Sequence, residues 1–383
     1  MKLAVVSNVC GYRWAGSETL WHLAALQALV AGHEVTAVIH PDLAASEQVA
    51  TFVRLGGRVR LWHKPKIARL QTLKECILPG FPASFLDSFD CILISLGSLP
   101  SLCYVPGLAM GLLHTRAHVV LLCQFNAGHL SITRQERDTV AAILRYCPCC
   151  VFVSRRNLEE ARRQFAVDLA QAHVVGNPIR SILPEPLIWP DIDATAHFAC
   201  VARLETAWKG QDLLLDVLSQ VPWRERDWHL TFYGEGPDRE HLGRLVELFN
   251  LSTRVTFAGF VSELTDIWAR NQMLLLPSHG EGLPLSVLEA MMFGRPVVAT
   301  DVGGNSEIID NGINGFIAEA ATARSFETAL QRAWDTRERW IHMGRSAHTR
   351  ACEVAKENPA SALVSFWLHA GAEVCVAPQI RSP

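Results

Sequence analysis

The sequence has no uninterrupted apolar run of about 20 residues, the length that a membrane-spanning helix requires. Its first residues, MKLAVVSN, hold only a short apolar stretch after Lys2 before polar residues follow, unlike a secretory signal. Charged residues are also sparse, at 19% of the chain, and the formal net charge is −3. These features argue against a transmembrane protein, a disordered chain and a nucleic-acid-binding protein, and they predict a cytoplasmic globular protein.

Two kinds of ligand-binding motif are also missing. The thiol cluster Cys147, Cys149 and Cys150 has no second Cys or His pair at zinc-ligand spacing, so we predict buried thiols and no metal site. The loop after the first apolar run reads SNVCGYRWAGSE, which lacks the Gly-x-Gly-x-x-Gly spacing of a dehydrogenase-type dinucleotide site. No bound cofactor is therefore expected.

The chain does contain a regular alternation of short apolar runs and helix-length intervals. With 383 residues, 49% of them hydrophobic, it can bury two cores. The alternation predicts an α/β fold of doubly wound parallel sheets with helices on both faces. The strand-like runs are 3–7, 35–39, 58–62, 91–95, 118–123, 150–154 and 173–176 in the first half, and 197–202, 230–234, 255–259, 273–278 and 296–300 in the second.

The first predicted helix begins at about Ser17 and ends at Gly32. Its predicted apolar face comprises Leu20, Leu23, Ala24 and Val30. A later helix, after Pro237, repeats apolar residues at helical spacing.

A proline-rich stretch at residues 177–193 cannot sustain a helix or a central strand, so we predict the domain linker there. This gives a first Rossmann-like domain at residues 1–178 and a second Rossmann-like domain at 179–357. Residues 358–383 form a helix and tail, which Pro359 separates from the preceding helical stretch and which is expected to return toward the first domain.

Polar residues follow the strands of the second half, at the edge where open α/β sheets bind ligands. Arg203 comes after the strand that ends at Ala202, and Lys209 with Gly210 follows just before a helix. Two cations beside a helix start make a plausible cradle for a diphosphate. In FYGEGPDRE, Gly234 and Gly236 permit a tight turn, which a purely structural role explains equally well.

The segment PSHGEGLPLSVLEAMMFGRPVVATDVGG is the most informative. Glu281 lies in a Gly-flanked loop and is expected to face outward, and Pro284 suits the first turn of the helix that follows. Glu289 lies on that otherwise apolar helix, where burying a carboxylate costs several kcal/mol without strong donors. A polar ligand therefore explains Glu289 well, and a solvated helix face is the alternative.

Taken in order, VARLETAWKG, YGEGP, VTFAGFV and the Glu, seven residues, Glu segment resemble the retaining glycosyltransferases of family 4, which are group 1 glycosyltransferases with the GT-B fold. The resemblance covers residues 197–318 strongly, and the first half only through AGSE and GHEVTAVI. It implies two Rossmann-like domains facing a central cleft, with a nucleotide-sugar donor on the second and a hydroxyl acceptor largely on the first.

The resemblance also implies roles for individual residues. Arg203 and Lys209 would neutralise the leaving diphosphate, Glu281 would hold the donor-sugar hydroxyls, and we take these three as the catalytic candidates. Glu289 would accept hydrogen bonds from the ribose hydroxyls. The other donor-binding candidates are Gly16, Gly234, Gly236, Gly282, Leu283, Pro284 and Leu285.

Two features depart from the family pattern. Ala15 precedes Gly16 where two consecutive glycines are usual, which puts the close approach of that loop in doubt. After the strand HVVLLC, where many relatives place a histidine, this chain has Gln124, which cannot act as an acid or base near neutral pH. The acceptor-side candidates are therefore Gln124, Asn126 and His129.

We expect metal-independent transfer of a hexosyl unit from a UDP- or GDP-linked sugar to a glycan, lipid-linked or small-molecule hydroxyl acceptor, with retention. The alternatives are a nucleotide-sugar epimerase or hydrolase on the same fold and a non-catalytic nucleotide-sugar-binding protein. The basic, aromatic-bearing residues 54–74 suggest peripheral membrane association, although a strand with exposed loops explains them as well.

Overall fold

The computed structural model describes residues 1–11, 14–63, 81–105, 107–128, 131–190 and 195–369. The chain forms two compact units. The first unit contains Met1–Pro178 together with Asn358–Pro383, and the second contains Ile179–Glu357. The first unit is therefore built from both ends of the chain, and the second is a single continuous stretch.

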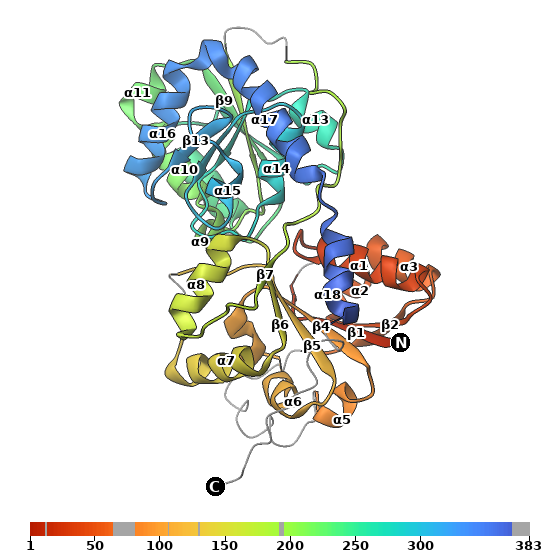
Figure 1. The fold of residues 1–383 in the computed structure, drawn as a ribbon. Helices are drawn as coiled ribbons and strands as arrows, with labels where there is room; N and C mark the ends of the chain where they lie inside the picture. Colours follow the sequence, from red (N-terminus) through yellow and green to blue (C-terminus); the bar gives the residue numbers. More distant parts are fainter. Residues whose placement is uncertain (12–13, 64–80, 106, 129–130, 191–194, 370–383) are drawn as a thin grey trace. The chain divides into compact units, whose positions relative to one another are not determined.

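The first unit is built on a seven-stranded sheet in the order β3-β2-β1-β4-β5-β6-β7, and all its strand pairs are parallel (Figure 1). Every residue of β4 is buried, as expected for a central strand that is covered on both faces. The strands are β1 Lys2–Ser7, β2 Glu34–Ile39, β3 Arg58–Leu61, β4 Cys91–Leu96, β5 His118–Cys123, β6 Cys149–Phe152 and β7 His173–Val174.

Helices cover both faces of this sheet. On one face α18 packs against α1 and against β4 and β5, and on the other α6 and α7 pack with η2. The described helices of the unit are α1 Glu18–Val30, α2 Pro41–Ala44, α3 Glu47–Arg54, α5 Ala83–Leu86, η2 Leu99–Cys103, α6 Leu108–His114, α7 Arg134–Tyr146, α8 Arg155–Phe165 and α18 Pro359–His369.

The second unit holds a six-stranded parallel sheet in the order β10-β9-β8-β11-β12-β13. Its strands are β8 Ala196–Val201, β9 Trp228–Tyr233, β10 Val255–Gly259, β11 Met273–Leu276, β12 Val297–Thr300 and β13 Gly315–Ala318. Its helices are α9 Thr206–Lys209, α10 Gln211–Ser219, α11 Val221–Arg224, α12 Arg239–Leu248, α13 Leu264–Trp268, α14 Leu285–Met292, α15 Asn305–Ile308, α16 Ala323–Asp335, η3 Arg337–Arg339 and α17 Trp340–Ala355. The helix α10 packs with α12 and α16, and α14 packs with α17 (Figure 1).

Two parallel-sheet α/β units confirm the predicted fold class. The predicted apolar face of the first helix was wrong in part, because Leu23 and Val30 are exposed while Leu20 and Ala24 are fully buried. Trp21, Ala25 and Ala28 are buried in their place. The reason is that α1 packs against α18 as well as beside the sheet, so its buried surface is not the stripe that the sequence suggested.

The proline-rich stretch predicted as a linker is attached to the second unit over its described part, from Ile179 to Pro190. The guanidinium of Arg295, which is fully buried, donates hydrogen bonds to the carbonyls of Leu187 and Ile188 at 3.2 and 2.9 Å. It also donates to the carbonyls of Trp268, Asn271, Phe293 and Gly294. Arg295 thus ties this stretch to the ends of α13 and α14.

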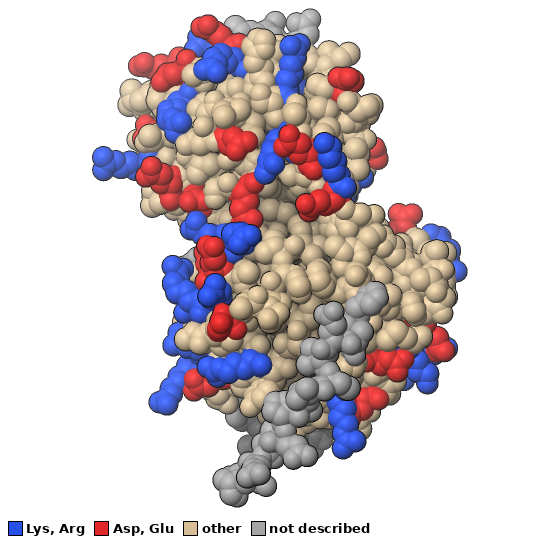
Figure 2. All heavy atoms as spheres, in the orientation of Figure 1, with Lys and Arg blue, Asp and Glu red and all other residues tan. Residues whose placement is uncertain are grey.

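Basic side chains gather over α7 and α8, which carry seven arginines (Figure 2). Ion pairs partly neutralise them, among them Arg134 with Asp138, Arg156 with Glu160 and Arg162 with Asp168. Of the basic segment predicted at residues 54–74, only residues 54–63 are within the described structure. Across the described residues, no helix is both long and apolar enough to cross a bilayer.

Candidate functional site

The candidate site lies where the strand order of the second sheet reverses, between β8 and β11. Connections leave these neighbouring strands in opposite directions, so the loops at their carboxyl ends separate and leave room for a ligand. The loop after β8 leads to Arg203 and to α9, which ends in Lys209. The loop after β11 carries Glu281 and leads into α14. The fold therefore brings together the candidates that the sequence places at these strand ends.

Lys209 and Glu281 are in direct contact across this edge. The Lys209 Nζ lies 2.6 Å from Glu281 Oε1, and the Ser278 hydroxyl donates to the same oxygen at 2.7 Å. The Glu281 side chain is only 8% exposed. The expectation that Glu281 faces outward was therefore wrong, because Lys209 and Ser278 supply the donors that allow its carboxylate to be buried.

Further hydrogen bonds hold the loop that carries Glu281. The Thr300 hydroxyl, at the end of β12, donates to the carbonyl of Ser278 at 2.6 Å. The side chain of Asn305 in turn donates to the carbonyl of Thr300 at 2.9 Å. All three residues are buried. Glu281 is consequently positioned by a hydrogen-bonded series that extends from α9 to α15.

Arg203 lies at the same edge and is partly exposed, with its Nε 3.4 Å from Glu205 Oε2. The side chain of Gln211, the first residue of α10, donates to the carbonyl of Arg203 at 2.6 Å. The backbone N–H and hydroxyl of Thr206 both donate to Asp238, and these hydrogen bonds hold the pKa of that carboxyl below its ordinary value. The turn that carries Arg203 and Lys209 is thus fixed to both α10 and the start of α12.

Gly234 and Gly236 are required by close backbone contact. A Cβ on Gly234 would lie 2.2 Å from the carbonyl oxygen of Ala202, and one on Gly236 would lie 2.2 Å from that of Leu204. The turn after β9 therefore packs directly on the turn that carries Arg203. This contact supports the structural explanation for both glycines, and nothing in it tests donor binding.

Glu289, on α14, is 2% exposed and lies 2.6 Å from the Nε of Arg180. Burial raises the pKa of Glu289 above its ordinary value, while the hydrogen bond and charge of Arg180 act in the opposite direction. From the sequence we expected a ligand to supply the donor that this carboxylate needs. The structure supplies one from the protein, and Arg180 was missed because it lies 109 residues away in a stretch that resembled a linker.

The other donor-side candidates form the start of α14. Pro284 occupies the N-cap position and Leu285 is the first helical residue. The carbonyl of Gly282 accepts a hydrogen bond from the backbone of Gly304 at 2.7 Å, and Leu283 is buried. The helix N-terminus, whose first backbone N–H groups have no partner within the helix, thus lies at the same strand edge as Lys209.

In the first unit, two acceptor-side candidates follow β5 and are buried. Neither amide atom of Gln124 has a hydrogen-bond partner among the described residues, and the same is true of the Asn126 side-chain oxygen. The Asn126 amide nitrogen donates to Gln164 of α8 at 2.8 Å. Asn157, also on α8, is fully buried with both amide atoms unpartnered among the described residues. His129 lies outside the described residues.

The loop before α1 holds the remaining candidate, Gly16, whose carbonyl accepts from the backbone of Thr19. Two residues later, Glu18 is completely buried, and its carboxylate accepts hydrogen bonds from Ser7 at 2.6 Å and from Trp21 at 2.7 Å. Burial raises the pKa of Glu18 to about 7, against the lowering effect of these hydrogen bonds. Glu18 was not among the residues predicted from the sequence, because its only signal was a carboxylate in a mostly apolar helix.

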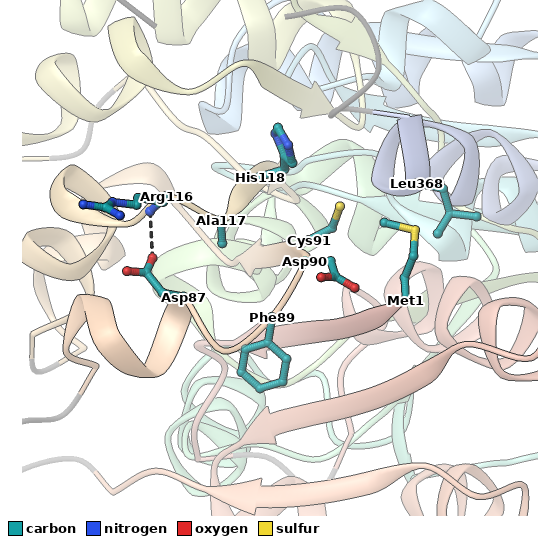
Figure 3. A pocket seen from close by; sticks show the side chains of 9 residues that line it. All are labelled: Met1, Asp87, Phe89, Asp90, Cys91, Arg116, Ala117, His118 and Leu368. Carbon is teal, nitrogen blue, oxygen red and sulfur yellow. Dashed lines mark hydrogen bonds between the residues drawn. The ribbon is translucent and has the colours of Figure 1, made fainter. Parts of the chain in front are cut away.

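A hollow of about 740 Å³ lies at the opposite edge of the first sheet, where β4 and β5 begin (Figure 3). Cys91 and His118 line it, together with Asp87 and Arg116. Asp87 already accepts hydrogen bonds from the Thr115 hydroxyl and the Arg116 backbone, both at 2.7 Å. The hollow is therefore separate from the strand ends that carry the candidate residues.

The described residues contain no group of three or more His, Cys, Asp and Glu side chains that is arranged to hold a metal ion. Within that part of the chain, Cys149 and Cys150 of the thiol cluster are buried, and Cys147 is half-buried. The Cys147 thiol donates to the backbone carbonyls of Val119 and Cys149.

Residues 195–336 match the family model of the glycosyl transferases group 1. Within the curated proteins, a glycosyltransferase of Haemophilus influenzae described as uncharacterized is 30% identical over 138 residues, which are 36% of this chain and 39% of that protein. The alpha-D-kanosaminyltransferase of Streptomyces kanamyceticus is 30% identical over 141 residues, or 36% of each chain. The resemblance to group 1 glycosyltransferases is thus confirmed over the second unit, and it spans less than half of either relative.

Two solved structures resemble nearly the whole chain. Sucrose-phosphate synthase from Thermosynechococcus elongatus has a TM-score of 0.74 at 18% identity, covering 97% of this chain and 100% of the other. The Anabaena protein Alr3699/HepE, in complex with UDP and glucose, has a TM-score of 0.69 at 16% identity, covering 95% and 98%. Both are GT-B structures, and at this identity they confirm the fold alone.

Proposed function

Because residues 195–336 match the family model of the glycosyl transferases group 1, we propose that the chain transfers a hexosyl unit from a UDP- or GDP-linked sugar to a hydroxyl acceptor. The observation that carries this proposal is the contact between Lys209 and Glu281 at the point where the strand order reverses. A cation for a diphosphate and a carboxylate for sugar hydroxyls lie together there, as a nucleotide sugar requires.

Lys209 and Arg203 act on the leaving group. As the bond between the sugar and the diphosphate breaks, negative charge grows on the departing oxygen, and preformed cations stabilise it without rearranging. The start of α14 adds backbone N–H donors at the same strand edge. These groups can stabilise the departing charge with no metal ion, and we propose metal-independent transfer.

Glu281 is proposed to orient the sugar. Its carboxylate is fixed by Lys209 and Ser278 through one oxygen, Oε1. The other oxygen can accept hydrogen bonds from sugar hydroxyls. Among the described residues its side-chain partners are a cation and a hydroxyl, so the arrangement suits donor binding better than paired-acid hydrolysis, and we propose retention of configuration.

Glu289 is proposed to accept hydrogen bonds from the two ribose hydroxyls of the donor. Its ion pair with Arg180 occupies one oxygen, Oε1, and the charge of Arg180 opposes the rise in the pKa of Glu289 that burial causes. An acceptor with a full charge binds a hydroxyl more strongly than a neutral amide does.

The first unit is proposed to bind the hydroxyl acceptor through Gln124 and Asn126. A buried amide without a partner is costly, whereas the hydroxyls of a glycan offer both donors and acceptors to satisfy it. His129 stays a candidate from the sequence. Location in the cytoplasm and association with anionic membranes stay predictions of the sequence as well.

The test is release of nucleoside diphosphate from UDP- and GDP-hexoses, with and without sugar and lipid-linked acceptors. A transferase releases UDP or GDP chiefly when an acceptor is present. A hydrolase would release it without one, and an epimerase would change the sugar without release. If the protein bound none of these nucleotide sugars, as judged by thermal shift, the proposal would be wrong.

A further inference from the structure

The loop after β11 also carries His279. It lies between Ser278 and Gly280, two residues before Glu281. Its backbone N–H donates to the carbonyl of Trp208 in α9 at 2.8 Å. This hydrogen bond holds the residue against the helix that ends in Lys209.

The imidazole ring lies over the junction of α9 and α10. Its Nε2 is 3.5 Å from the point that a Cβ on Gly210 would occupy. Gly210 is both the C-cap of α9 and the N-cap of α10, with φ of 62°, and no side chain caps α10. A side chain at Gly210 would also come 2.3 Å from the carbonyl oxygen of Pro277. The glycine thus leaves room for the ring beside the N-terminus of α10.

The ring is also available for a ligand. His279 is half-buried, and its ring nitrogens make no hydrogen bond within the described residues. Lys209, the next residue before Gly210, is the cation that the proposed function assigns to the diphosphate. An imidazole beside this cation and a helix N-terminus is well placed to donate to an anion.

We propose that His279 donates a hydrogen bond to the diphosphate of the nucleotide sugar and takes up a proton when the nucleotide sugar binds. This inference rests on the proposed function and adds a specificity-determining residue to the same site. Binding of the anionic diphosphate favours the charged imidazolium, so ligand affinity and protonation are linked. Affinity should therefore be higher at pH 6 than at pH 8.

Other charged side chains lie on the elements that surround His279. Lys209 carries a positive charge next to Gly210, and it is paired with the carboxylate of Glu281. Other charged side chains on the packed turns, among the described residues, include Arg203, Glu205, Asp212 and Asp238. A nucleotide sugar is a suitable probe because its diphosphate is esterified at both ends and therefore lacks the phosphate ionisation near pH 6.

The experiment is isothermal titration calorimetry with UDP-glucose and GDP-mannose at pH 6, 7 and 8, each in two buffers that differ in ionisation enthalpy. The difference in heat between the buffers gives the protons taken up. For the wild type we expect proton uptake near pH 7 and a dissociation constant that rises about tenfold from pH 6 to pH 8, which corresponds to about 1.4 kcal/mol. His279→Gln should bind without proton uptake and with a flat pH profile. The exposed His241→Gln, on α12, is the matched control and should behave as the wild type.

The outcomes separate the two proposals. If UDP-glucose or GDP-mannose binds but no proton is taken up, or if His279→Gln keeps the wild-type uptake, the role of His279 is wrong and the proposed function stands. If neither sugar nucleotide binds the wild type at any pH, the proposed function itself fails. Circular dichroism establishes that each variant is folded, and His279→Asn provides a second neutral replacement.

Discussion

For single residues, the ion pair between Lys209 and Glu281 means that replacing Lys209 has two effects at once. Lys209→Ala removes a cation whose interaction strengthens as the diphosphate departs, and it also takes from Glu281 one of the two donors to its Oε1 atom, leaving the Ser278 hydroxyl. We expect turnover to fall by roughly 2.7 to 4 kcal/mol of barrier, by analogy with the loss of one donor that stabilises an oxyanion. Single-turnover rates measure this directly.

Binding of UDP or GDP alone should suffer less than turnover in the Lys209→Ala variant. Lys209→Arg is the control, because it keeps the charge. If Lys209→Ala folds normally and transfers sugar at the wild-type rate, Lys209 does not belong to the reaction.

Glu289→Gln should mainly weaken nucleotide binding, because a contact to ribose is present in the ground and transition states alike. We expect a loss of about 1.5 to 3 kcal/mol in binding free energy, the range for hydrogen bonds to charged groups. Titration calorimetry with UDP and GDP measures it.

Arg180→Gln distinguishes the two roles of Glu289. If Glu289 serves only to hold Arg180, the two variants lose the same stability and bind nucleotide like the wild type. If Glu289 also binds the ribose, Glu289→Gln binds the nucleotide more weakly than Arg180→Gln does, although the two variants are equally stable.

Glu18 predicts a pH dependence of stability. Its pKa is about 7 in the folded protein against an ordinary value of 4.5, so the folded state binds this proton more tightly. The resulting stability is complete below about pH 4.5 and is lost as the pH rises through 7, with an upper limit of about 3 kcal/mol. Glu18→Gln, which resembles the protonated form, should therefore be more stable than the wild type at pH 8. Urea unfolding at pH 5.5 and 8.0 tests this, and an equal pH dependence of both proteins would contradict it.

At the scale of elements, one buried side chain holds the stretch from Ile179 to Pro190 on the second unit. Arg295 is fully buried and donates to six backbone carbonyls, and burial lowers its pKa to about 10. Arg295→Met keeps much of the volume but leaves these carbonyls without a donor. We expect a loss of about 3 kcal/mol or more in the free energy of unfolding, because each unsatisfied buried group costs about 1 to 3 kcal/mol. Chemical denaturation measures it, and a loss below about 1 kcal/mol would show that other donors replace the guanidinium.

The elements were predictable where the pattern was simple. Buried parallel strands such as β4 and β5 are continuous apolar runs, which the sequence shows directly. The last strand, Gly315–Ala318, was missed because it has four residues and begins with glycine. The face of α1 was wrong because the helix that packs on it, α18, lies more than 300 residues later in the chain.

The candidate site shows the same limit. The strand-end positions of Arg203, Lys209 and Glu281 follow from the pattern, since parallel strands bring their carboxyl ends to one edge. Which side chains pair there does not follow. The contact of Glu281 with Lys209 joins residues 72 positions apart, and that of Glu289 with Arg180 joins residues 109 positions apart. Local sequence patterns do not predict contacts over such separations.

At the scale of the whole molecule, two units with separate cores predict two unfolding transitions. UDP or GDP at about one hundred times its dissociation constant should stabilise the second unit by about 2.7 kcal/mol and leave the first unchanged. Differential scanning calorimetry measures this, and the variants Arg295→Met and Glu18→Gln identify which transition belongs to which unit. A nucleotide that shifted only the first-unit transition would contradict the donor assignment.

The discontinuity of the first unit has a consequence for synthesis on the ribosome. The face of the first sheet that carries α1 is covered in part by α18, which begins at Pro359. When residues 1–178 have emerged, that face has α1 but still lacks α18. The complete second unit must be translated before α18 exists. The unit that is made first is therefore the one that is finished last, and the nascent chain carries an uncovered apolar surface through about half of its synthesis.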